Sequence, residues 1–282
     1  MRTIDYLNSK NQKLIIGEDP GFQLVDLQGI NPPKASFSTS TLAGFDGSRV
    51  IGSMVNARNI VLVLQLSGYI ESNKLKLYDI FKIKRNGFLT YSSDLLSIQI
   101  EAYVESIDIP PMVWPIKAMI SLLCPQPYFE DLQDILIDVA AIDPTLSFPL
   151  ELFSSGGEIG IIHPSEAQNI LNPGDIPVGM SLRFQAIGTV VKPKIINTQT
   201  LQSLELNLTL QAGDIVTINT EIGKKRIELN QSGVITNQFN SLVLGSTFLQ
   251  LDEGDNVLYV TSESGSSFLL TQIAFRPRYS GA

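Results

Sequence analysis

The chain has 282 residues, of which 44% are hydrophobic and only 17% are charged. Its 20 basic and 28 acidic residues give a net charge of -8, which argues against a nucleic-acid-binding protein, because such proteins need clustered cations to displace counterions from phosphates. The length suits two domains, and the low charge is typical of virion, cell-surface or assembly proteins with a sizeable core.

The start of the chain and its apolar runs indicate where the protein is made. Residues 1–6 lack the apolar core of a signal peptide. The longest clean apolar run, residues 60–64, is far shorter than the ~20 residues that cross a bilayer. We therefore expect a protein that is made in a cytoplasm and has no membrane partner.

Residues 31–55 form a long stretch that is too polar and too rich in turn residues to be core. It is also unusually long for a plain connection. Phe37, Leu42 and Phe45 are spread along it, and an isolated monomer would leave some of these side chains in water. We expect an extended arm that buries these three residues on a neighbouring subunit. The alternative is a surface loop folded back on its own domain.

Residues 72–86 favour a helix. Ser72 suits an N-cap, and Gly87 stands where a helix commonly ends with a left-handed residue. An apolar stripe of helical spacing supports this interpretation and consists of Leu77, Tyr78, Ile80 and Phe81. A strand is the alternative, because Leu75 and Leu77 alternate with lysines over a few residues.

Strand patterns dominate the rest of the chain. Apolar and polar residues alternate over residues 98–104 and again over residues 204–210, which is the period of a half-buried strand. Residues 215–218 and 257–260 follow the turn pairs Gly213-Asp214 and Gly254-Asp255. Frequent turns of this kind in the C-terminal half predict a β-sandwich.

The best domain boundary follows Pro125 and Pro127, because two closely spaced prolines stop regular structure. A new strand pattern begins at Ile135. We therefore predict two domains, residues 1–131 and residues 132–282, in a mainly β chain.

Residues that carry chemistry are few. Cys124 lies in an apolar run and is expected to be a buried structural thiol, and no second cysteine exists to form a disulfide. His163 is the only histidine and has no partner motif, and Gly223-Lys224 lacks the spacing of a phosphate loop. We predict no catalytic, cofactor-binding or metal-binding residues and expect a structural protein, not an enzyme.

Several segments together resemble the distal tail proteins of bacteriophages with long, non-contractile tails. Their order and spacing over nearly the whole chain carry the resemblance. The segments are residues 44–47 (GFDG), 58–62 (RNIVL), 78–81 (YDIF), 86–91 (NGFLTY), 121–129 (SLLCPQPYF), 148–149 (FP), 213–218 (GDIVTI), 223–225 (GKK) and 275–281 (FRPRYSG).

The resemblance implies a fold and a set of partners. The fold is a β-rich, ring-forming N-terminal domain with one α-helix, followed by a galectin-like β-sandwich. The protein would form a homo-hexamer at the tail tip of the virion, after assembly in the cytoplasm of the host bacterium. Its partners would be the tail tube protein, a tail-associated lysin or tail fibre protein, and receptor-binding proteins. DNA would pass through the lumen without specific binding, and an acidic net charge suits such a conduit.

Two other functions compete with this hypothesis. A carbohydrate-binding module would also suit a galectin-like sandwich, although residues 132–282 contain no tryptophan for sugar stacking. A wall-degrading enzyme needs only two suitably placed carboxylates among the 28 acidic residues. A glycan array tests the first alternative, and a peptidoglycan-turnover assay tests the second.

Overall fold

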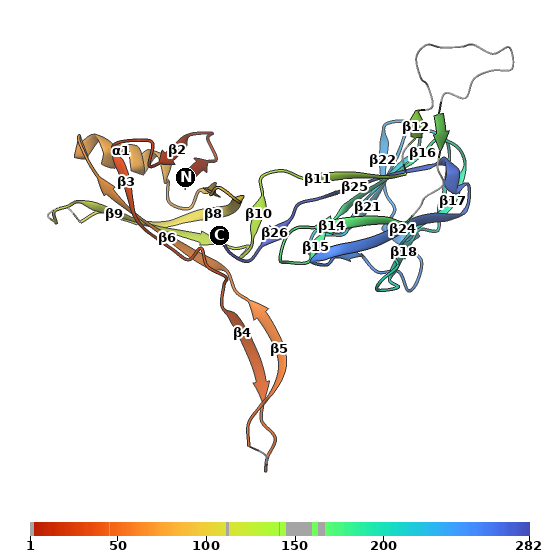
Figure 1. Cartoon of the computed structure of the whole chain (residues 1–282), viewed down its shortest axis with the longest axis horizontal. Coiled ribbons are helices and arrows are strands. Elements are labelled where there is room, and N and C mark those ends of the chain that lie inside the picture. The colour runs from red at the N-terminus through yellow and green to blue at the C-terminus, as the bar shows by residue number, and fades with distance from the viewer. Residues whose placement is uncertain (1–2, 45, 111–112, 141, 145–159, 163–166) are drawn as a thin grey trace. The chain divides into compact units, whose positions relative to one another are not determined.

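The computed structural model describes residues 3–44, 46–110, 113–140, 142–144, 160–162 and 167–282. The chain divides into two compact units (Figure 1). Unit 1 consists of Met1–Leu132 and Arg278–Ala282, and unit 2 consists of Gln133–Pro277. The sequence prediction placed residues 278–282 at the end of the second domain, whereas here they pair within unit 1.

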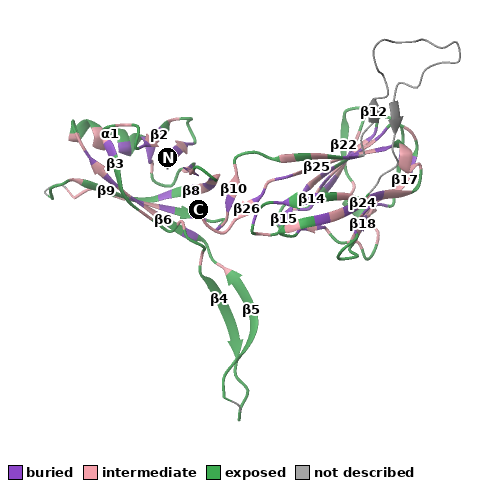
Figure 2. Ribbon diagram, in the orientation of Figure 1, coloured by how far each residue is buried: buried purple, intermediate pink, exposed green. Residues whose placement is uncertain are grey.

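Unit 1 is built on a nine-stranded antiparallel sheet. Its strands are β1 (Thr3–Asn8), β2 (Lys13–Ile16), β3 (Phe22–Gln28), β6 (Arg58–Leu66), β7 (Asn86–Ser92), β8 (Ser97–Asp108), β9 (Lys117–Cys124), β10 (Phe129–Asp131) and β26 (Arg278–Tyr279). The main path runs β2-β1-β7-β8-β9-β6-β3, and β10 pairs with both β8 and β26. Buried residues alternate strictly along β6 and β9, and along β8 as far as Val104, which gives the sheet one apolar face (Figure 2).

Helix α1 (Ile70–Ile80) contributes Leu77 and Ile80 to the core of unit 1. The predicted helix over 72–86 was right in kind and wrong at its end. Lys84 has a φ of +65°, and its N–H donates to the Val104 carbonyl, so the chain has already joined the sheet. Gly87 lies inside β7, where it lets the strand approach the Tyr6 hydroxyl closely.

The two remaining strands of unit 1 form a separate hairpin. They are β4 (Ala35–Ser40) and β5 (Arg49–Val55), and they pair only with each other. In Figure 1 the hairpin projects away from the nine-stranded sheet.

Unit 2 contains two antiparallel sheets that share one hydrophobic core. The first sheet runs in the order β11 (Ile135–Ala140), β25 (Leu269–Phe275), β16 (Ser181–Ala186), β20 (Ile215–Asn219), β21 (Arg226–Gln231) and β22 (Val234–Asn237). The second runs β14 (Gln168–Asn172), β24 (Gly254–Ser264), β17 (Val190–Asn197) and β18 (Ser203–Glu205), with β19 (Thr209–Leu210) also on β17. This arrangement is a β-sandwich, so the prediction of a mainly β chain is confirmed.

The smaller elements of unit 2 complete the sandwich. They are the pairs β12 (Ile142–Pro144) with β13 (Gly160–Ile162) and β15 (Val178–Gly179) with β23 (Gln250–Leu251), and the 3₁₀ turns η1 (Phe239–Ser241) and η2 (Ser266–Phe268).

The single strand predicted over residues 204–210 is split into β18 and β19. Opposite the break, Lys192 has a φ of +49° and Pro193 has no N–H, so the ladder is interrupted there. The Asn207 N–H turns instead to the Ser241 carbonyl, at 2.7 Å.

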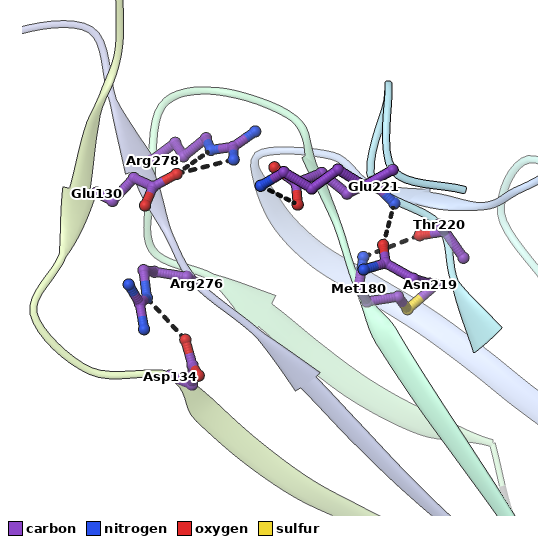
Figure 3. A network of polar contacts seen from close by, with 9 residues as sticks. Glu130, Asp134, Met180, Asn219, Thr220, Glu221, Arg276 and Arg278 are labelled. Atoms are coloured by element: carbon purple, nitrogen blue, oxygen red, sulfur yellow. Dashed lines mark hydrogen bonds and ion pairs between the residues drawn. The ribbon is translucent and has the colours of Figure 1, made fainter. Parts of the chain in front are cut away.

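Ion pairs lie close to the two points where the chain passes between the units (Figure 3). Within unit 1, Arg278 donates twice to one Glu130 carboxylate oxygen, at 2.8 and 3.0 Å, across the β10–β26 pair. Within unit 2, the Arg276 Nε lies 2.7 Å from Asp134. Two segments of the chain connect the units, one that enters unit 2 and one that leaves it. Within its own unit, each ion pair therefore links these two segments to each other.

Candidate assembly interface

The β4–β5 hairpin, called the arm from here on, has almost no buried surface of its own. Every residue of β4 is exposed, and so is every residue of β5 except Val55 (Figure 2). An isolated two-stranded hairpin is marginally stable in water, because it has no apolar face to bury. The arm therefore has the form of an element that is completed by another surface.

The arm has two different faces. Ala35 pairs with Val55, Phe37 with Ser53 and Thr39 with Val50, and side chains at these positions share one face because strand residues alternate. Ser36, Ser38 and Ser40 occupy the opposite face of β4. A register shift between Ser38 and Thr39 leaves Ile51 without a direct partner. The first face is thus the more apolar one.

The structure places two of the three predicted interface residues on this arm. Phe37 is 63% exposed in β4, and Leu42, just beyond β4, is 67% exposed. Phe45 lies outside the described residues. Sequence reasoning missed Val50, Ile51 and Met54, which are similarly exposed on β5. The alternation of Phe37 with serines was the signal that could have identified strands here.

The base of the arm is held by Arg58, the first residue after the arm that is buried. Its Nη1 donates to the Gly29 and Ile30 carbonyls, at 3.3 Å each, and its Nη2 contacts the Ser280 carbonyl. Its guanidinium carbon lies 4.8 Å from the centre of the Phe129 ring. Burial lowers the pKa of Arg58, and five available donors let one cation bind several carbonyls at once.

Close backbone contacts also fix the base of the arm. The Ala282 N–H donates to the Ile30 carbonyl at 3.0 Å. Gly29 has a φ of +84°, and a Cβ at this position would collide with the Asn59 carbonyl oxygen. Glycine is therefore required where the chain turns from β3 toward the arm.

A second surface is the exposed face of the unit 1 sheet. On this face the Asn59 amide and the Ser121 hydroxyl both donate to the Glu105 carboxylate, at 2.9 and 2.8 Å. Farther along, the Asn86 amide donates to Glu101 at 2.9 Å. Among the described side chains, neither carboxylate forms an ion pair with a cation.

Two buried titratable groups of unit 1, the Cys124 thiol and the Tyr6 hydroxyl, are kept neutral. Burial raises the pKa of the Cys124 thiol to about 12 and that of the Tyr6 hydroxyl to about 12. Cys124 is fully buried, as expected for a structural thiol. A thiol in this environment is a poor nucleophile at neutral pH.

Within the described ranges, no group of three or more His, Cys, Asp or Glu residues is arranged to hold a metal ion. His163, the only histidine, lies outside those ranges. In the part of the chain that the structure covers, no helix has the length and apolar character needed to cross a membrane.

Comparisons with known proteins give one family match. Residues 173–279 match the family described as siphovirus-type tail component, C-terminal domain. No curated protein matches the chain.

Among solved structures, the SPP1 Dit (gp 19.1) protein has a similar fold, with a TM-score of 0.68 at 13% identity over 99% of each chain. That protein is described as a paradigm of the hub adsorption apparatus in phages that infect Gram-positive bacteria. Chains of the phage P2 baseplate in its activated conformation, with Ca and with Sr, align over 100% of each chain at 9% identity with a TM-score of 0.49. The resemblance to siphophage distal tail proteins is confirmed.

Proposed function

We propose that this chain, whose residues 173–279 match the siphovirus-type tail component C-terminal domain, is a tail-tip hub subunit that closes with copies of itself into a ring. The observation that carries the proposal is the arm, which projects from unit 1 with Phe37 and Val50 exposed on one face. A head-to-tail contact in which each arm lies on the next subunit closes into a ring when the rotation between subunits permits.

The number of subunits in this proposal is six, as the resemblance to the distal tail proteins implies. In such a ring each arm would bury its apolar face on the unit 1 of a neighbour. The arm consists of two paired strands, and the contacts of Arg58 fix its base. It can therefore extend from unit 1 in a fixed direction. Unit 2 is not needed for this contact.

The exposed face of the unit 1 sheet is our candidate for the lining of the central channel. Glu101 and Glu105 give that face negative charge. An acidic wall repels phosphates, so DNA would pass without specific binding.

The remaining partners follow from the position of a hub. The ring would lie at the tail tip of the virion, between the tail tube protein and a tail-associated lysin or tail fibre protein, with receptor-binding proteins attached at its periphery. Unit 2, proposed here to be galectin-like, would provide that periphery. Assembly would take place in the host cytoplasm, and the role is structural and not enzymatic.

The experiment is native mass spectrometry of the purified chain, combined with negative-stain electron microscopy. We expect six chains and a ring with a central hole. Because Ala35 and Val55 are paired, residues 36–54 can be replaced by a two-residue Asn-Gly turn that keeps the base of the arm. This variant should be monomeric and should retain the melting behaviour of both units. A variant that still forms the same ring would exclude the arm as the ring contact.

A further inference from the structure

Strand β22 is an open edge of the first sheet of unit 2. All four of its residues are exposed, and none of them is charged. At the other edge, β11 carries Asp138 and a register shift next to it, and both features discourage pairing with another strand. Of the two described edges of this sheet, β22 is therefore the one that lacks the usual protection against strand addition.

The direction of the backbone groups of β22 follows from its pairing with β21. The Gln238 N–H donates to the Ile227 carbonyl at 2.9 Å, in register with the β21–β22 ladder. Because hydrogen-bonded and non-hydrogen-bonded pairs alternate in an antiparallel ladder, Val234 and Thr236 also bond toward β21. Ile235 and Asn237 therefore point their N–H and C=O groups away from the sheet.

The turn before β22 supports this register. Ser232 and Gly233 have φ angles of +51° and +89°, as in a two-residue hairpin turn of type I′. Such a turn joins Gln231 and Val234, and these two residues are paired. Val234 and Ile235 are each 65% exposed, so the edge offers apolar side chains on both faces of the sheet as well as free backbone groups.

Cationic residues lie at one end of the open edge. Arg226 begins β21 beyond the end of β22, and Lys225 precedes it. The Lys225 ammonium lies 5.1 Å from the centre of the Phe248 ring, which stacks on Phe239. Arg226 also pairs with Glu228 at 3.7 Å, so an acidic residue on an incoming strand would meet Lys225 directly and Arg226 in competition with Glu228.

We propose that β22 binds an extended segment of another protein, which adds to the sheet as an additional strand. The recognised segment has alternating β-branched or aromatic residues and an acidic residue at the end that lies beside Lys225 and Arg226. Backbone bonds to Ile235 and Asn237 hold the segment, and apolar side chains on it cover Val234 and Ile235.

A second copy of the chain is a less suitable occupant. Symmetric pairing of two β22 strands joins only four residues from each, a length of about 13 Å. A contact of this length is short for a stable protein interface, which buries roughly 1,000 Å² or more. A foreign segment can extend beyond the strand, over Phe239 and the cationic end.

The test uses the full-length chain and fluorescein-labelled peptides in a polarisation assay. The probes are alternating Thr-Val hexapeptides with Asp-Asp at the N-terminal end, at the C-terminal end or at neither end. We expect saturable binding of one of the two acidic probes, and Lys225→Glu should weaken that binding at least threefold. Absence of binding of every probe at 1 mM would overturn the proposal.

Two substitutions separate the edge from the fold. Ile235→Pro removes an outward N–H and leaves the bonds to β21 intact, so it should weaken binding at least tenfold without unfolding unit 2. Ile235→Thr keeps the N–H and the β-branch and should bind within about threefold of the natural chain. Asn237→Pro is the second proline variant, should the first fail to fold.

Equal binding by the proline and threonine variants would show that the peptide does not use the edge, and the proposal would then be wrong. Sedimentation of the same variants tests the other occupant. A self-association that Ile235→Pro abolishes would assign the edge to a second copy. Ring formation through the arm is measured separately and does not affect either result.

Discussion

Replacement of Phe37 by serine tests the arm most directly. Fully burying a phenylalanine side chain stabilises a protein by about 1.5–3 kcal/mol. In the single chain 63% of Phe37 is exposed, so a neighbour that covers the exposed part can recover most of this energy. We therefore expect the substitution to remove ~1–2 kcal/mol from each contact between subunits.

A loss of this size is easily measured in a closed ring. It weakens a single contact by about 5- to 30-fold, and each subunit takes part in two contacts. Sedimentation velocity over a range of protein concentrations should show the transition from ring to monomer at much higher concentration. The melting temperature of the monomer should stay the same, because Phe37 contributes little to the core of its own chain.

The matched control lies on the opposite face of the same strand. Ser38→Thr keeps the strand character of β4 and changes a side chain that points away from Phe37, so it should leave assembly unchanged. If Phe37→Ser and Ser38→Thr assemble equally well, the Phe37 face of the arm is not the contact between subunits. A strongly lowered melting temperature for Phe37→Ser would refute the claim that the arm is free in the monomer.

Three further predictions concern the fold. Arg58→Ala removes a donor from three carbonyl groups, of which the Ile30 carbonyl keeps the Ala282 N–H, and should lower the free energy of unfolding of unit 1 by about 3 kcal/mol, measured by urea denaturation, whereas Arg58→Lys should recover part of this loss. The raised pKa values of Cys124 and Tyr6 stabilise the fold below pH 9, and this stability should be lost between pH 9 and about 12, since the unfolded state ionises first. Cys124→Ala should reduce this pH dependence, and a slope that does not change would exclude the thiol as its source. The fragment 133–277 should melt cooperatively with β-type circular dichroism, and a disordered fragment would show that unit 2 needs unit 1.

Much of the fold could be predicted from local patterns. The period-two alternation over 98–104 places a strand correctly, because half-buried strands need one apolar face. The buried state of Cys124 follows from its apolar neighbours in the same way. The exposed stretch around Phe37 was also recognised, since its polarity and length are incompatible with a core.

Long-range contacts account for what the sequence did not reveal. The helix ends at Ile80 because Lys84 and Arg85 bond with Val104, a partner that no local pattern identifies. Arg58 looked like the first residue of an ordinary strand, yet it binds carbonyls at Gly29 and Ser280, far away in the chain. The open edge at β22 likewise depends on the order of strands in the sheet.

The division of the chain between the units has a consequence for how such a protein can change. Unit 2 is an insertion, because unit 1 resumes at Arg278 after ending at Leu132. Glu130 and Arg278 are paired neighbours, so the two ends of the insertion leave unit 1 at adjacent strand positions. A short turn between them could close unit 1 without unit 2. The gene segment for residues 133–277 is thus a cassette that recombination could exchange for another domain while the sheet and the arm of unit 1 remain intact.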